Sequence, residues 1–273
     1  MDQLPADLQS FDSPAAIGEY LAGRILPRIE VARLAGRSFL LGCPTGRSPR
    51  PVYTAMARLL GERGQDLSKL ILVMMDEYLD GRDSHFQYVS DKLPWSCHRF
   101  ARDDIRAVLN ASLAASHNIP LESIWFPDPG DPAAYDGRIS GAGGIDFFIL
   151  ASGASDGHVA FNPPGSGRDS RTRIIELSEQ TRRDNLQSFP ELGTLDRVPT
   201  HGISVGIDTI ASARAAAMIV WGASKAESVR RMLATTSYGA AWPATVIHDC
   251  PGGVILADRE AARGVSVESG RAK

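Results

Sequence analysis

The chain is poor in cysteine. Its three cysteines, Cys43, Cys97 and Cys250, are far apart and show no C-x-x-C spacing, so we expect reduced thiols in the core or in loops rather than a disulfide framework or a zinc site. Cys97 and His98, together with His85, could suggest a metal site, but adjacent residues rarely face one ion and hard-ligand partners are missing. We therefore expect no metal.

The sequence also lacks long apolar runs and an excess of positive charge. No run approaches the roughly 20 apolar residues of a membrane span, and Met1–Pro5 is acidic and polar where a signal peptide is basic and then apolar. The net charge is −3, whereas binding to a nucleic-acid backbone requires a basic excess. We expect a cytoplasmic protein with a small-molecule partner and neither nucleic-acid nor membrane partners.

Length and composition are those of an ordinary globular protein. The 273 residues are 43% hydrophobic and 22% charged, which suffices for a sizeable core. Short aliphatic runs alternate with helical patterns and are continuous, as in strands covered on both faces. This predicts one α/β domain over residues 1–273, with a parallel, doubly wound sheet. The runs are residues 38–42, 70–75, 145–151, 202–206, 215–221 and 253–257.

The loop after the first of these runs opens a helix. Ser48 can cap the helix with Pro49 at its first position, and Val52, Met56 and Leu59 then share its inward face. Thr45-Gly46-Arg47-Ser48 presents amides, hydroxyls and a guanidinium at the helix N-terminus, which suits a phosphate dianion. A plain capped turn is the alternative, because neither G-x-x-x-x-G-K-[ST] nor G-x-G-x-x-G occurs.

A second helix start follows the run 215–221. Ser224 and Glu227 have the spacing of a capping box, with Val229 and Leu233 facing inward. Lys225 lies at this junction in a chain that has only four lysines against 25 arginines. Either it is an accident of the surface, or it supplies a point charge for a phosphate.

Asp76 and Glu77 directly follow the apolar run 70–75. We expect one side chain to point into the crevice at the carboxyl ends of the strands, where open α/β sheets bind ligands, and the other toward a neighbouring helix. A carboxylate in that crevice can carry a proton between adjacent sugar carbons. The alternative is a helix cap or an ion pair at a strand end.

The loop 153–166 allows two interpretations. Gly153-Ala154-Ser155-Asp156-Gly157 matches the G-x-S-x-G nucleophile elbow, but an elbow runs into a long helix, and Pro163-Pro164-Gly165 predicts an irregular loop. In the other interpretation Asp156 orients His158, which takes and returns a proton. A structural histidine packed under the loop remains the alternative.

Taken together, these segments resemble the glucosamine-6-phosphate deaminase family over about residues 38–258. The related 6-phosphogluconolactonases share the first loop, a D-E pair and D-G-H, whereas the A-F-N and S-R-T-R blocks favour the deaminase branch. The segments that carry the resemblance are Pro44-Thr45-Gly46-Arg47-Ser48-Pro49, Met75-Asp76-Glu77-Tyr78, Asp156-Gly157-His158-Val159-Ala160-Phe161-Asn162, Ser170-Arg171-Thr172-Arg173 and Gly222-Ala223-Ser224-Lys225.

The resemblance implies a Rossmann-like sheet with helices on both faces and conversion of an amino-sugar phosphate to a ketose phosphate plus ammonia, without metal or organic cofactor. Asp76 would match the aspartate that moves a proton between C1 and C2. His158 would match the ring-opening histidine, with Asp156 as its partner. The 45–48 loop and Lys225 would match the phosphate clamp, with Glu77 also in the binding set. A homo-oligomer is compatible with this family.

Three positions depart from the family pattern. Pro163 stands where the family has the glutamate that completes the histidine's relay. Gln187 stands where an ungapped alignment places a phosphate-binding arginine, although Arg182 and Arg183 are near in sequence. Ile175 stands where the family has an allosteric lysine. Residues 81–96 also differ from the usual stretch after M-D-E-Y, so the substrate can be another amino-sugar phosphate.

We therefore expect a deaminating aldose–ketose isomerase, an enzyme of the hydrolase/isomerase kind, that acts on glucosamine 6-phosphate or a close relative. The first alternative is hydrolysis of a sugar-phosphate lactone, with His158 activating water. The second is a sugar-phosphate-binding protein that has lost the chemistry, which the proline at Pro163 motivates. A serine hydrolase acting through Ser155 is the least supported hypothesis.

Overall fold

The computed structural model describes residues 6–82 and 85–265. Met1–Pro5, on which the expectation about a signal peptide rests, and Lys273 lie outside the described residues. The same holds for the side chain of Gln187. Within the described residues, no helix has both the length and the apolar character needed to cross a membrane.

Seven strands form a sheet in which every pair is parallel. The central strands are buried along their length because helices cover both faces, which explains why their sequences are continuous apolar runs. In spatial order the strands are β1 (Asp7–Phe11), β11 (Val254–Asp258), β10 (Ala216–Val220), β7 (Phe147–Ala151), β2 (Phe39–Cys43), β3 (Leu70–Met74) and β6 (Ile124–Trp125).

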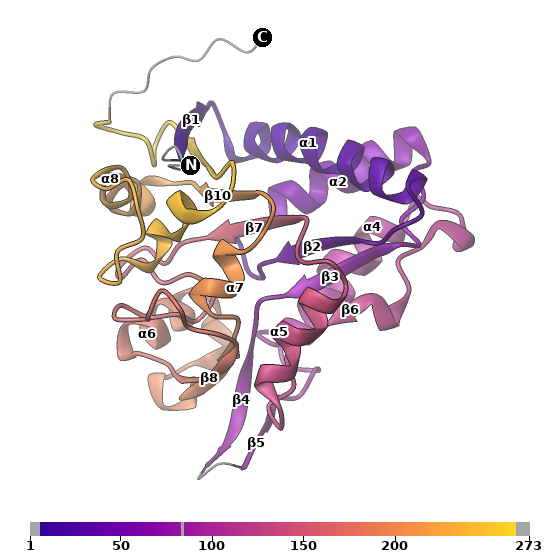
Figure 1. Ribbon diagram of the computed structural model, residues 1–273. Helices are drawn as coiled ribbons and strands as arrows, with labels where there is room; N and C mark the ends of the chain where they lie inside the picture. Colours follow the sequence, from indigo (N-terminus) through magenta and orange to yellow (C-terminus); the bar gives the residue numbers. More distant parts are fainter. Residues whose placement is uncertain (1–5, 83–84, 266–273) are drawn as a thin grey trace.

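Helices pack on both faces of this sheet, as predicted (Figure 1). One face buries apolar side chains of α1 and α2 and of the helical stretch that runs from α3 to α4 through a π-helical turn. The other face buries those of α5, α7 and α8. The helices are α1 (Pro14–Leu34), α2 (Arg50–Arg63), α3 (Cys97–Phe100), α4 (Ala107–Asn110), α5 (Pro132–Gly141), α6 (Glu179–Ser188), α7 (Ile207–Ala211) and α8 (Ala226–Leu233).

A smaller antiparallel sheet carries the rest of the strands. Its members in spatial order are β5 (His85–Tyr88), β4 (Asp76–Arg82), β9 (His201–Ser204) and β8 (Arg173–Glu176). The expectation that the run 202–206 belongs to the parallel sheet is therefore wrong. Gly202–Ser204 is buried, so its apolar sequence looks like that of a central parallel strand. Figure 1 shows β4 and β5 extending away from the main sheet.

Both predicted helix starts are shifted. Helix α2 begins at Arg50, and its N-cap residue is Pro49, so Ser48 does not cap it. The capping box at Ser224 is absent too, because a 3₁₀ turn places Lys225 at the N-cap of α8 without a side-chain cap. Glu227 instead pairs with two arginines of its own helix. The predicted inward faces are confirmed, since Val52, Met56, Leu59 and Val229 are buried and Leu233 packs against the core.

Candidate active site

Four chain segments bring the predicted site residues to one edge of the parallel sheet. They follow β10, β7, β2 and β3, which are consecutive neighbours in the sheet. Because all four strands run in the same direction, their carboxyl ends meet at that edge. The 44–49 loop follows β2, Asp76 comes two residues after the end of β3, the 153–166 loop follows β7, and Lys225 follows β10.

Asp76 is a nearly buried carboxylate, with 6% of its surface exposed. Its Oδ1 accepts a hydrogen bond from the Cys97 thiol, with Sγ at 3.6 Å. The same sulfur lies 3.4 Å from Oγ1 of Thr45, so the thiol connects the 44–49 loop to the Asp76 carboxylate. Burial, helped by the charge of Glu77, raises the pKa of Asp76 to about 7, although the Cys97 hydrogen bond opposes this. Such a carboxyl can accept and return a proton near neutral pH.

Glu77 follows Asp76 in β4, where successive side chains alternate between the two faces of a sheet. Its fully buried carboxylate accepts hydrogen bonds from the backbone amides of Cys97 (3.0 Å) and His98 (2.8 Å) and from the Ser96 hydroxyl (3.0 Å). The Nδ1 atom of His98 lies 2.7 Å from the same group. Glu77 therefore stabilises the N-terminus of α3. This matches the expectation that one carboxylate of the pair faces a helix, and we assign Glu77 no part in binding.

The loop 153–166 contains no helix, as predicted. In it, the Nδ1 atom of His158 lies 2.7 Å from Oδ1 of Asp156, which also accepts from the His158 amide at 3.1 Å. Burial tends to raise the pKa of Asp156, but the hydrogen bonds and charge of His158, with a bond from Thr181, hold it at about 2. Gly153 is required beside the pair, because a Cβ there would lie 2.3 Å from Nδ1 of His158. Asp156 thus remains charged and orients the imidazole.

Lys225 reaches back from the start of α8 to the end of β7, where its ammonium donates a hydrogen bond to the Ser152 carbonyl. Burial lowers the pKa of Lys225 to about 8; Arg47 adds to this, whereas Asp184 and Asp156 oppose it. The guanidinium of Arg47 lies over the ring of Trp221, with Cζ 5.2 Å from its centroid. The two cations, from different strand ends, therefore act on one region.

Comparison with known proteins identifies the family. The family described as glucosamine-6-phosphate isomerases/6-phosphogluconolactonase matches residues 12–256. The chain belongs to this family. The glucosamine-6-phosphate deaminase of Arthrobacter sp. (strain FB24) is 35% identical over 229 residues, which cover 82% of this chain and 80% of that one. The deaminase of Mycolicibacterium smegmatis is 36% identical over 231 residues with the same coverage.

Solved structures agree with this family assignment. A monomeric glucosamine-6-phosphate deaminase matches with a TM-score of 0.78 at 26% identity, covering 94% of this chain and 98% of that one. The 6-phosphogluconolactonase of Trypanosoma brucei matches with a TM-score of 0.69 at 20% identity, covering 96% and 100%. The second likeness concerns the fold alone. The resemblance seen in the sequence motifs is thus confirmed.

Two of the motifs that carry the family resemblance hold the fold together behind the site. Asn162 is fully buried, and its amide donates to the carbonyls of Val159 (3.0 Å) and Val205 (2.8 Å), while its oxygen accepts from Arg173 at 2.9 Å. Thr172 donates its backbone N–H to Asp136 at 2.9 Å. The Asn162 contacts join the 153–166 loop to the small sheet, and the Thr172 bond joins the start of β8 to α5.

The departures from the family pattern also have structural contexts. The carbonyl of Pro163 accepts from the hydroxyl of Ser166 at 2.8 Å, closing a turn. Arg182 donates to backbone carbonyls of the 195–198 segment, and Arg183 pairs with Glu179 on the surface. Ile175 is buried in β8. The side chains of Arg182 and Arg183 are thus engaged elsewhere, and Arg47 is the arginine whose charge acts on Lys225.

Sequence reasoning missed two side chains of the site. Cys97 is buried, as expected of all three cysteines, yet it also contacts Asp76. Asp184 belongs to α6 and offers a carboxylate oxygen that lies within 4.8 Å of ligand atoms of both Asp156 and His158. This trio is the one group of potential metal donors among residues 6–82 and 85–265, and it differs from the group around Cys97 considered above. The charges of Asp184 and Asp156 both favour the charged form of Lys225, so we interpret the trio as part of a charged network.

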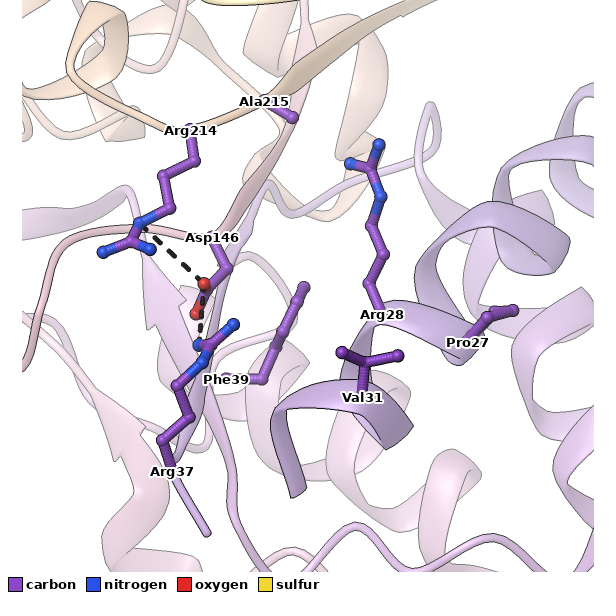
Figure 2. Close-up of a pocket in the computed structure, with 8 residues that line it drawn as sticks. All are labelled: Pro27, Arg28, Val31, Arg37, Phe39, Asp146, Arg214 and Ala215. Carbon is purple, nitrogen blue, oxygen red and sulfur yellow. Dashed lines mark hydrogen bonds and ion pairs between the residues drawn. The ribbon is translucent and has the colours of Figure 1, made fainter. Parts of the chain in front are cut away.

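A hollow of about 370 Å³ lies at the opposite edge of the sheet, at the amino ends of β2, β7 and β10 (Figure 2). Its charged groups largely satisfy one another, since Arg37 lies 2.8 Å and Arg214 4.0 Å from Oδ1 of Asp146. The guanidinium of Arg28 lies over the Phe147 ring at 5.3 Å. None of the predicted site residues lines this hollow, and ligands of such sheets bind at the carboxyl edge. The candidate active site is therefore the cluster around Asp76, His158 and Lys225.

Proposed function

We propose that the chain is a deaminating aldose–ketose isomerase that converts an amino-sugar 6-phosphate, glucosamine 6-phosphate or a close relative, to a ketose phosphate plus ammonia. The observation that carries this proposal is Asp76, a nearly buried carboxylate with a pKa near 7 at the edge where the His158 loop and Lys225 also lie. The names of the curated relatives support the choice of reaction.

The phosphate end of the substrate binds to Lys225, Arg47 and the loop Thr45-Gly46-Arg47-Ser48. Gly46 has φ of +83°, a conformation that glycine adopts without strain and that turns the loop at the start of α2. Backbone amides at a helix start and two nearby cations suit a dianion. The phosphate would in turn favour the charged form of Lys225.

His158 opens the sugar ring. Its Nδ1 is engaged by Asp156, which leaves Nε2 to take the proton of the C1 hydroxyl. The bond between C1 and the ring oxygen breaks, and the same proton passes to that oxygen, so the imidazole ends as it began. Asp156 stabilises the transient positive charge on the ring.

Asp76 then transfers a proton from C2 to C1. As a carboxylate it takes the C2 proton, and as an acid it returns it to C1. One proton of the C2 ammonium passes to O1, so the aldehyde and the ammonium become a hydroxymethyl group and a C2 iminium. Water adds to C2, and ammonia leaves. Protons move but no electrons are gained or lost, so the proposed reaction has no step that needs a redox cofactor.

The test is ammonia release from glucosamine 6-phosphate and its epimers mannosamine and galactosamine 6-phosphate. We expect release from one of them, with solvent deuterium at C1 of the ketose in the fraction of turnovers in which the proton held by Asp76 exchanges with solvent. A lactonase moves no carbon-bound proton, so hydrolysis of 6-phosphogluconolactone without ammonia release from the panel would replace this proposal by the lactonase alternative. Tight binding of the amino-sugar phosphates without turnover would replace it by a binding protein.

We also propose the setting of this activity. The site draws side chains from both sheets, which supports one functional unit over residues 1–273. The three free cysteines are buried and fit a reducing cytoplasm, where sugar phosphates are retained by their charge. Size-exclusion chromatography with light scattering would distinguish a monomer from the homo-oligomer that the family resemblance allows.

A further inference from the structure

The imidazole of His158 faces two carboxylates from different parts of the chain. One is Asp156, from the same loop, at 2.7 Å from Nδ1. The other is Asp184 of α6, and one of its oxygens, one of Asp156 and a ring nitrogen of His158 all lie within 4.8 Å of one another. A carboxylate at this range attracts the positive charge of an imidazolium that forms on the ring.

Two uncharged donors fix the Asp184 carboxylate in this place. The Ser155 hydroxyl donates to Oδ1 of Asp184 at 3.1 Å, and the side-chain amide of Gln180, one helical turn earlier, donates to the same oxygen at 3.0 Å. These bonds orient the carboxylate without neutralising its charge. They also give Ser155 a concrete role as a tie between the 153–166 loop and α6.

The charge of Asp184 also reaches the proposed phosphate site. Asp184 and Asp156 both favour the charged form of Lys225, against burial and Arg47. The negative charge of Asp184 therefore acts on Lys225 as well as lying beside the ring-opening pair.

We propose that Asp184 is a positioning residue that acts through His158, as the second carboxylate that stabilises the imidazolium formed while the sugar ring opens. This inference rests on the function proposed above. In this proposal a residue of α6 assists the histidine of the 153–166 loop. Asp184 gives His158 a second carboxylate partner, although Pro163 has no carboxylate.

The experiment begins with wild-type protein and the ammonia assay, which tests the function itself. Asp184→Asn keeps the shape and removes the charge. We expect kcat to fall roughly 10- to 100-fold, the loss typical when the outer partner of a metal-bound histidine is removed, with KM changed less than about threefold. Asp184→Glu should recover most of kcat. Glu179→Gln is the matched control, because it removes a negative charge from the exposed face of the same helix.

A second measurement isolates ring opening. In an Asp76→Asn background, where transfer between C2 and C1 is blocked, exchange between the substrate's anomers by NMR reports opening and closing alone. Adding Asp184→Asn should slow this exchange. Calorimetry with the open-chain amino-alditol 6-phosphate should show unchanged affinity, and circular dichroism melting should show a folded variant.

The outcomes separate the two proposals. No ammonia from wild type across the panel would reject the function. Ammonia from wild type with kcat of Asp184→Asn within twofold of it would overturn the role of Asp184. Weaker binding of the open-chain compound with unchanged anomer exchange would also overturn it, because Asp184 would then act in binding.

Discussion

The thiol of Cys97 donates its hydrogen bond to Oδ1 of Asp76 across 3.6 Å, and the same sulfur lies 3.4 Å from the hydroxyl of Thr45. A neutral donor thus contacts the proposed base. Burial raises the pKa of the Cys97 thiol well above its usual range, so the sulfur stays protonated and can keep donating.

Cys97→Ala should move the pH dependence of turnover. The Cys97 hydrogen bond lowers the pKa of Asp76, so its removal raises that pKa and shifts the rising limb of kcat to higher pH. Cys97→Ser keeps a donor and should restore the profile. Cys250→Ala, at a buried cysteine that contacts the carbonyls of Ile210 and Val246, is the control. Identical profiles for Cys97→Ala and wild type would contradict the role of the thiol.

Asp76→Asn should abolish turnover and stabilise the fold at neutral pH. Loss of a general base typically costs about 10²- to 10⁴-fold in rate. The pKa of Asp76 is about 7 in the folded chain, against an ordinary aspartate value of 3.8. Between these pH values the folded chain binds the extra proton, so wild-type stability falls as pH rises. At about 1.4 kcal/mol per pKa unit, the variant gains at most about 4 kcal/mol by pH 8.

Urea unfolding of wild type and Asp76→Asn at pH 5 and pH 8 checks the stability prediction. The difference in unfolding free energy between the two proteins should be larger at pH 8. An equal difference at both pH values would show that the Asp76 carboxyl titrates normally.

Lys225→Ala should weaken substrate binding more than turnover. A hydrogen bond to a charged group is worth about 1.5–3 kcal/mol, which corresponds to roughly 10- to 100-fold in KM. Because the pKa of Lys225 is lowered to about 8, the affinity of wild type for inorganic phosphate should also decline as pH rises through 8. Calorimetry from pH 7 to 9 measures this. A variant that loses kcat at unchanged KM would place Lys225 in the chemistry.

Glu77→Gln should destabilise the protein. The carboxylate accepts amide hydrogen bonds at the start of α3 while fully buried, and a glutamine nitrogen cannot accept them. We expect a loss of about 1–3 kcal/mol in the free energy of unfolding. Glu122→Gln, on a surface 3₁₀ turn, should change it little. Equal melting temperatures for the two variants would show that the Glu77 carboxylate does not stabilise the start of α3.

Gly153→Ala should damage turnover through the Asp156–His158 pair. The added Cβ would lie 2.3 Å from Nδ1 of His158 and 2.6 Å from Oδ1 of Asp156, so the pair must move. We expect kcat to fall while phosphate affinity stays near wild type. Gly137→Ala is the control, because nothing lies within 4 Å of a Cβ there. Unchanged kcat would show that the pair tolerates displacement.

Much of the parallel sheet could be predicted because its central strands are covered on both faces and are therefore apolar throughout. The same rule misplaced β9, which is buried in the antiparallel sheet. It also missed β4, because its sequence, DEYLDGR, is mostly polar. Burial can be read from such a run, but the direction of its neighbours cannot, since pairing depends on residues far away in sequence.

The candidate site was predictable where a residue lies in the segment that follows a strand of the parallel sheet. Asp76, His158 and Lys225 all lie in such segments, two, seven and five residues after β3, β7 and β10, and topology alone brings these segments to one edge. Cys97 and Asp184 do not. Asp184 lies in α6, whose sequence looks like that of an ordinary exposed helix, and nothing local distinguishes it from Glu179. Only the way α6 packs against the 153–166 loop places it beside His158.

The alternation of Asp76 and Glu77 makes this dipeptide intolerant of length changes. One carboxylate is left able to exchange protons, and its neighbour is tied to a helix. Inserting or deleting a single residue in Met74–Asp76 would exchange the two faces of β4, sending the helix anchor into the crevice and the proton carrier into the packing. In a library of single-residue deletions, we therefore expect no active variant with a deletion in Met74–Asp76.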